Sequence, residues 1–123
     1  MPSIEKLTFA AQIAHEANRA FSLQNGDTSQ PAWADAPDHV KTSAINGVMA
    51  IVQNPNLSPA DCHANWMAHK AQTGWKFGPV RDEAKKTHPY MVPYLELPEQ
   101  ARLKDVVFGA AARGALATYV DKK

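Results

Sequence analysis

Tryptophan and basic side chains gather in one part of the chain, between residues 63 and 88. Trp66 follows His63 by three positions, which places both on one helical face. An indole ring is a flat surface on which another planar ring can stack, and a neighbouring lysine or arginine can contact an anionic oxygen. The same stretch holds the densest basic run of the chain: Lys70, Lys76, Arg81, Lys85, Lys86 and His88. These residue types indicate a site for a flat, anionic small molecule.

The same residues also have structural interpretations, which the sequence leaves open. Trp66 stands at the spacing of a core residue. Trp75 follows a helix-ending glycine and would pack over a hairpin, whereas Trp33 stands in a proline-rich turn and would cover the core or line a cleft. The basic run is also typical of a solvated loop. His63, like His15 in the first expected helix, would bond a backbone carbonyl.

No pattern in the sequence favours catalysis or metal binding. The chain has no glycine-rich phosphate loop, no nucleophile elbow and no paired acids beside a base. Glu16 adjoins His15, but neighbouring side chains on a helix point apart. Cys62, His63 and His69 do not share the common helical face that a tetrahedral metal site needs. We therefore expect no enzyme activity, no metal and no cofactor.

Composition limits the classes of protein to which the chain can belong. It has 123 residues, 45% of them apolar, which suits a single domain over residues 1–123. A net charge of +1 argues against nucleic acid and membrane surfaces as partners. One cysteine, no apolar run of roughly 20 residues and no export signal predict a cytoplasmic protein. The oligomeric state stays open, a homodimer included.

Serine, proline and glycine positions divide most of the chain into helices. Ser3 and Ser58 are suited to begin helices because a hydroxyl oxygen can accept a free N–H of the first turn. We expect Asp35 to have the same role for the second helix. Gly26 and Gly74 would end helices in the left-handed conformation. The expected helices cover residues 4–24, 37–53, 59–73 and 98–119.

The segment from Trp75 to Leu97 is expected to be irregular, with two short extended pieces. Residues 75–77 alternate like a short strand that Gly78 turns, and residues 90–92 are bracketed by prolines. The expected fold is therefore mainly α, with four helices and short β-strands in the Trp75–Leu97 loop.

The two halves of the chain resemble each other weakly. Four pairs match in type and order: His15 with His63, Gly26 with Gly74, Pro31 with Pro79, and Pro37 with Pro98. The pattern suggests an internal repeat, about residues 4–54 and 56–119, folded as two helix pairs related by a pseudo-twofold axis. The cleft between such copies would be the natural ligand site.

Several motifs recur at spacings that are typical of one family. They are His63-Ala64-Asn65-Trp66, Gly74-Trp75-Lys76-Phe77-Gly78-Pro79, Arg81-Asp82, Lys85-Lys86, His88-Pro89 and Pro93-Tyr94, followed by Asp105. Upstream, His15-Glu16-Ala17-Asn18-Arg19 looks like the longer version found in bacterial and phage members. Together they resemble the RyR domain family, the repeats named for ryanodine receptor channels, over about residues 13 to 116. Phe77 and Tyr90 depart from the usual tyrosine and cysteine.

The resemblance implies a small helical domain rather than an enzyme. In the channels a cleft is reported to take adenine nucleotide, with tryptophans stacking on its rings, and prokaryotic members are suspected to sense or sequester nucleotide-derived signals. We therefore expect a small-molecule binding module for a nucleotide-like ligand. A protein-interaction or structural domain without a ligand is the alternative, and a cryptic nucleotide hydrolase is a second one. The candidate ligand-binding residues are Trp66, Trp33, Trp75, Lys70, Arg81, His63, Asn18 and Lys86.

Overall fold

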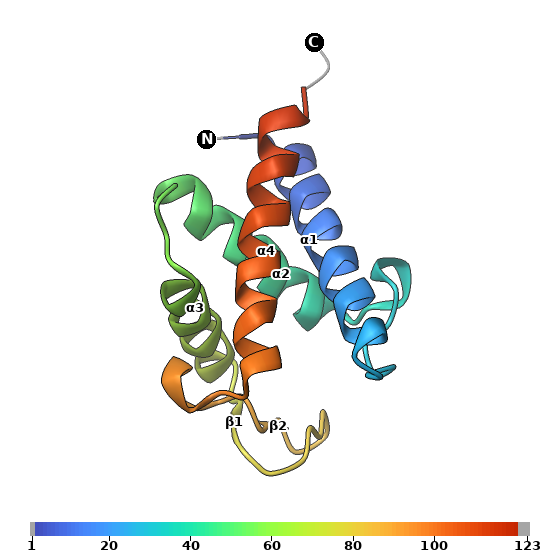
Figure 1. Cartoon of the computed structure of the whole chain (residues 1–123), viewed down its shortest axis with the longest axis vertical. Helices are drawn as coiled ribbons and strands as arrows, with labels where there is room; N and C mark the ends of the chain where they lie inside the picture. The colour runs from blue at the N-terminus through green and yellow to red at the C-terminus, as the bar shows by residue number, and fades with distance from the viewer. Residues whose placement is uncertain (1, 121–123) are drawn as a thin grey trace.

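A computed structural model describes residues 2–120 and confirms a mainly helical fold. Each helix begins and ends within one residue of its expected bound, and none of the described helices is long and apolar enough to cross a membrane. Short 3-10 turns, η1 and η2, precede the second and fourth helices (Figure 1). The elements are α1 (Ile4–Gln24), η1 (Trp33–Asp35), α2 (Asp38–Gln53), α3 (Pro59–Gln72), η2 (Tyr94–Glu96) and α4 (Glu99–Thr118).

The helix beginnings follow the expected chemistry at two sites and depart from it at a third. The Ser3 hydroxyl accepts the Lys6 N–H at 3.1 Å, and Ser58 forms a capping box with Asp61. Asp35 does not begin α2, so that prediction was wrong. It lies in η1, and the extended residue before α2 is Pro37. Proline sets the backbone there without a side-chain hydrogen bond.

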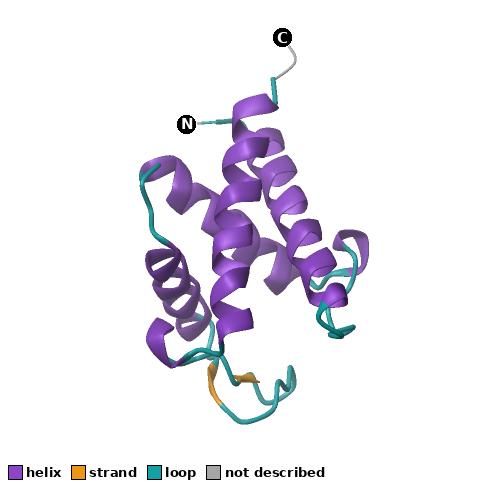
Figure 2. Ribbon diagram, viewed as in Figure 1, coloured by secondary structure: helices purple, strands orange, loops and turns teal. Residues whose placement is uncertain are grey.

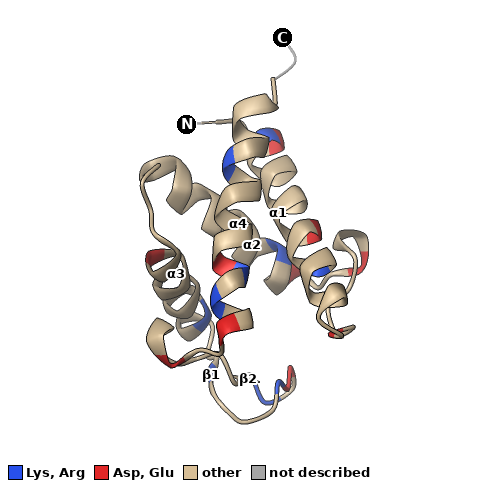
Figure 3. Ribbon diagram, viewed as in Figure 1, with Lys and Arg blue, Asp and Glu red and all other residues tan. Residues whose placement is uncertain are grey.

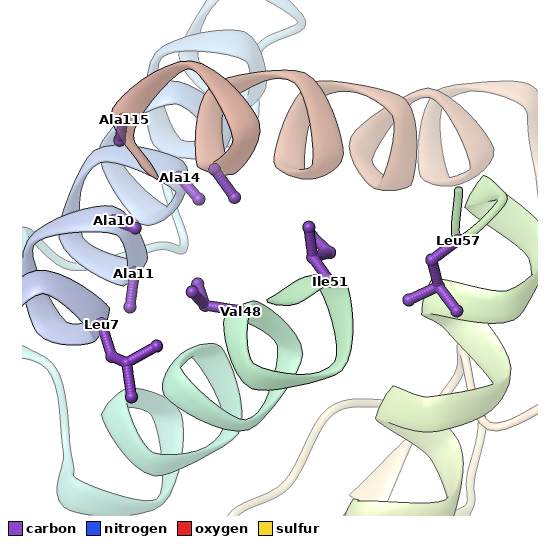
Figure 4. Packing of buried hydrophobic residues seen from close by; sticks show 9 residues of the cluster. Leu7, Ala10, Ala11, Ala14, Val48, Ile51, Leu57 and Ala115 are labelled. Atoms are coloured by element: carbon purple, nitrogen blue, oxygen red, sulfur yellow. The ribbon is translucent and has the colours of Figure 1, made fainter. Parts of the chain in front are cut away.

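Small side chains let three helices pack closely in the core. The buried alanines of α1, with Leu7, face Val48 and Ile51 of α2 and Ala115 of α4 (Figure 4). α1 packs most extensively on α4, and α3 packs on α2 and α4. α1 and α4 meet where the chain begins and ends: the Phe9 and Tyr119 rings lie 5.0 Å apart, so the start of α1 adjoins the end of α4.

Both expected glycine caps are confirmed. Gly26 has φ 81° and Gly74 has φ 93°, in the left-handed region that glycine enters at little cost. After each glycine the chain bonds back to the last turn: the Asp27 N–H donates to Ser22 O at 2.8 Å and the Trp75 N–H to Lys70 O at 3.0 Å.

Two short strands lie in the segment between α3 and α4, but not both where the sequence predicts them. β1 (Lys76–Phe77) pairs in parallel with β2 (Thr87–His88), as Figure 2 shows. The extended piece expected at 90–92 is wrong, because these residues form a turn and a bend. β1 and β2 are parallel and form no hairpin with each other, while a single antiparallel bridge joins Asp82 to Thr87. Close approach decides the position of β2: a Cβ on Gly78 would lie 2.5 Å from the Thr87 side chain.

The two halves share a local hydrogen-bond geometry. His15 Nε2 donates to Pro31 O at 2.8 Å, and His63 Nε2 donates to Val92 O at 2.7 Å. Val92 therefore accepts in the second half the bond that Pro31 accepts in the first, and the match of Pro31 with Pro79 stays a prediction from the sequence. The extra residues of the second half lie before Val92. This geometry supports the repeat, while the pseudo-twofold superposition of the halves stays a prediction.

Gly74→Ala should destabilise the fold by about 1 kcal/mol, because a side chain is strained at φ 93°. Gly114 is the matched control: it lies inside α4, and a Cβ there would meet nothing within 4 Å. Gly114→Ala should therefore stabilise by up to about 1 kcal/mol through helix propensity. Urea unfolding of both variants measures the two changes, and equal effects would contradict the left-handed cap.

Candidate functional site

Three cavities adjoin one another around Trp66, and we call them together the Trp66 crevice. The inner cavity, about 150 Å³, lies between α2, α3 and α4. The outer cavity, about 270 Å³, lies between the start of α4, the residues that follow α1 and the loop that precedes α4. The side cavity, about 160 Å³, lies between the start of α2 and the segment after α3. The half-buried Trp66 of α3 lines all three.

Two imidazole rings hold the Trp66 indole in place. His63, one turn earlier on α3, lies nearly parallel to it, with ring centroids 5.6 Å apart. His88 of β2 meets it at a steep angle, with centroids 5.0 Å apart. The aromatic neighbours fix the orientation of the ring without closing it off from the cavities.

His88 is a neutral imidazole with a defined tautomer. Its Nδ1 accepts the Tyr90 backbone N–H at 3.0 Å, so Nε2 carries the proton. Burial, together with the positive charges of Arg81 and Lys70, lowers the pKa of His88 to about 4. The ring therefore lines the outer and side cavities as an uncharged group at neutral pH.

Asp105 of α4 brings a carboxylate to both the inner and the outer cavity. The His63 Nδ1 lies 3.9 Å from Asp105 Oδ2, too far for a hydrogen bond. Within residues 2–120 the carboxylate accepts no hydrogen bond, and burial raises its pKa to about 7. Above about pH 7 this side chain is an ionised carboxylate and a free acceptor for a ligand.

Three cationic side chains, Lys70, Arg81 and Lys104, line the crevice together with the carboxylates of Asp27 and Asp105. Lys70 is only 5% exposed, and its Nζ lies 3.1 Å from His39 Nδ1 and over the Trp75 ring. Burial, with a smaller contribution from Arg81, lowers the pKa of Lys70 to about 8. Lys104 lies 3.7 Å from Asp27, and the pKa of this lysine is also lowered by burial and by Arg81. Charges of both signs mark the loop and the first half of α4 in Figure 3.

The structure brings five of the eight candidate residues to the crevice. Trp66, Trp75, Lys70 and Arg81 line the side cavity, and Trp66, Arg81 and His63 line the outer one. Trp75 is 6% exposed and packs under the Lys70 ammonium, so most of its surface serves packing.

The other three candidates lie elsewhere. Trp33 packs edge-on against His15, with centroids 5.6 Å apart, and does not line the crevice. Lys86 donates to Thr73 O at 2.7 Å and so fastens the loop to the end of α3. Asn18 has a buried Oδ1 that finds no partner among the described residues, but it too stays outside the crevice.

Sequence reasoning left Lys104 and Asp105 out of the site, and His88 entered it only as part of the basic run. One signal could have found the carboxylate: Asp105 follows the buried Ala101 by four positions and precedes the buried Gly109 by four, so an acid interrupts the buried stripe of α4. Within residues 2–120, no group of three or more histidine, cysteine, aspartate and glutamate side chains could hold a metal ion.

Comparison with protein families identifies the domain to which most of the chain is similar. The family model of the RyR domain matches residues 36–111, which is more than half of the chain. The matched range holds Trp66, Lys70, Arg81 and Asp105, and therefore most of the walls of the crevice. It leaves out α1 and the turn after it, which contribute His15, Asp27 and Gln30.

Asp105→Asn should stabilise the protein, and more so at pH 8 than at pH 5. The pKa of Asp105 is about 7 when folded and 3.8 in its ordinary state, so the folded protein loses stability as pH rises from about 4 to about 7. The amide removes that cost, which should exceed about 1 kcal/mol at pH 8. Thermal unfolding at both pH values measures it.

Asp27→Asn is the control for this experiment. The pKa of Asp27 is lowered, mainly by its hydrogen bonds with Ser29, so its carboxylate stabilises the folded state at neutral pH. This second variant should lose stability rather than gain it. An Asp105→Asn protein with the same gain at both pH values would show that the buried charge is not the cause.

Proposed function

The chain belongs to the RyR domain family, and on that basis we propose that it is a non-catalytic module that binds a nucleotide-like small molecule and senses or sequesters it. One observation carries the proposal: the Trp66 indole lines three adjoining cavities whose outer walls hold Lys70, Arg81 and Lys104. A stacking surface beside clustered cations suits a ligand with a flat ring at one end and an anionic group at the other.

The cations supply the stronger part of the argument for an anionic ligand. Arg81 lowers the pKa values of Lys70, Lys104 and His88, so these groups share one positive environment. A phosphate placed among them would relieve this repulsion and favour the charged form of Lys70. Arg81 is a third exposed and lies 3.7 Å from Glu83, so it can turn toward a ligand at little cost.

The size of the cavities limits how a ligand would sit. Each is smaller than about 300 Å³, the lower end for small-molecule pockets. All three share the Trp66 side chain, and the outer and side cavities also share Arg81 and His88. A nucleotide-sized ligand would therefore span two cavities across the indole.

The chemistry of the crevice fits binding better than hydrolysis. Cys62 lines the inner cavity, and burial raises the pKa of its thiol, which keeps it protonated and a poor nucleophile. His88 Nδ1 is already bonded to the Tyr90 N–H, so this nitrogen is not free to take a proton from a water. Chromatography of each nucleotide after incubation with the protein tests the hydrolase alternative. A hydrolysis product would support that alternative.

A second candidate function is protein interaction, and one observation favours it. The segment between α3 and α4 exposes three large apolar side chains, Phe77, Val80 and Leu95. Exposed apolar groups of this kind can contact a partner protein. Under this alternative the aromatic rings of the crevice serve only to pack the segment.

The first test is binding. A thermal-shift panel of ATP, ADP-ribose, cyclic nucleotides and cyclic dinucleotides should contain at least one ligand that raises Tm. Trp66→Leu keeps apolar bulk and removes the aromatic face, and it should weaken the affinity for that ligand by about 1–3 kcal/mol. Calorimetric titration measures the loss.

Trp33→Leu is the matched control, because Trp33 is also half-buried but lies outside the crevice. It should keep the affinity. Circular dichroism of both variants checks folding first. If a folded Trp66→Leu protein binds the ligand as tightly as the wild type does, the indole is not the stacking surface. If no ligand of the panel raises Tm, the protein-interaction function is favoured over small-molecule binding.

The second test addresses the charges. Arg81→Gln should lower the affinity for a polyphosphate ligand from the panel roughly fivefold, because one charge-assisted contact is lost. Lys85→Gln, an exposed lysine of the same loop outside the crevice, should leave the affinity unchanged. Titrations at low and high salt should show screening in the wild type and less of it in Arg81→Gln. Identical salt dependence in both proteins would remove Arg81 from the contact.

A further inference from the structure

The Asp105 carboxylate is the one acidic group shared by the inner and outer cavities. Its side chain is 19% exposed, and that exposure leads into the crevice that Trp66 also lines. The neighbouring carboxylate of the outer cavity, Asp27, is engaged by the Ser29 N–H at 2.9 Å and lies near Lys104. Asp105 has no such partner within residues 2–120.

The imidazole opposite Asp105 cannot satisfy it. His63 Nε2 donates to Val92 O at 2.7 Å, so in the neutral ring Nδ1 carries the lone pair. This nitrogen lies 3.9 Å from Asp105 Oδ2. Two acceptors therefore face the same space, and a group that enters it gains most when it brings N–H donors.

Positive charge around the crevice disfavours a ligand whose N–H donors belong to a cationic ring. Lys104 adjoins Asp105 on α4 and lines the same two cavities, while Arg81 lines the outer one. A cationic ring would meet repulsion from both. The fitting donor is thus an uncharged N–H, and a carboxylate accepts two neighbouring donors best because its two oxygens can bind side by side.

We infer that Asp105 selects the ring of the ligand, and that the preferred ring presents two neighbouring N–H donors, as the Watson–Crick edge of guanine does and that of adenine does not. The inference rests on the proposed nucleotide-binding function and narrows it to a ligand class. The ring lies on Trp66 with its donor edge toward Asp105, and the phosphate extends toward Arg81 and Lys70.

Three nucleotides that differ only in the base edge test the inference. GMP presents both donors, IMP only the ring N–H, and AMP an amino group beside an acceptor nitrogen. Calorimetric titration of the full chain should give affinities in the order GMP, IMP, AMP, with GMP at least about tenfold above AMP. Asp105→Asn should reduce this ratio to near one, because an amide offers one acceptor and one donor in place of two acceptors.

Asp35→Asn, at an exposed acid of η1 outside the crevice, is the control and should keep the preference for GMP. The ratio of two affinities within one protein does not depend on a small change in stability, and Tm confirms that each variant is folded. Equal affinities for the three nucleotides in the wild type, or an unchanged preference in Asp105→Asn, would overturn the inference and leave the proposed function standing. Absence of binding by all three at millimolar concentration would also overturn it, whereas the proposed function is judged by the wider panel.

Discussion

The hydrogen bond from His63 to Val92 O is the interaction on which the crevice depends. It joins groups 29 residues apart and holds the long segment against α3 just before the chain enters α4. The bond fixes the approach to η2, where the Tyr94 ring lies 6.2 Å from that of His63. A buried imidazole is suited to this role because it satisfies a carbonyl that the irregular segment leaves free.

The segment held by this bond carries the unusual chemistry of the protein. It supplies Arg81 and His88 to the crevice, and β2 lies beside the indole of Trp66. The corresponding turn in the first half is much shorter, and there His15 contacts Pro31 directly. If the spacing of the two halves is followed, Trp66 has Asn18 as its counterpart. The first half keeps the histidine that fixes the turn but has no indole at that position.

Local signals in the sequence predicted the helices well and the site only in part. Serine before the first turn, and glycine after the last, act within a few residues, so the bounds of α1 and α3 follow from short motifs. The position of β2 depends on how closely Gly78 approaches Thr87, which no local pattern shows. The burial of Lys70 and Asp105 depends on neighbours from other elements, so spacing alone could not distinguish these charges from solvated ones.

The contact of Phe9 with Tyr119 has a consequence for the architecture of larger chains. The start of α1 and the end of α4 meet on one side of the molecule, while Lys104 lies about 20 Å from Thr118 along the axis of α4. A neighbouring domain joined at either end would therefore stand clear of the crevice. The same geometry suits tandem arrangement or insertion into a surface loop, because entry and exit of the chain lie side by side. The fold is in this sense modular, because the ends at which another domain would be joined lie away from the Trp66 crevice.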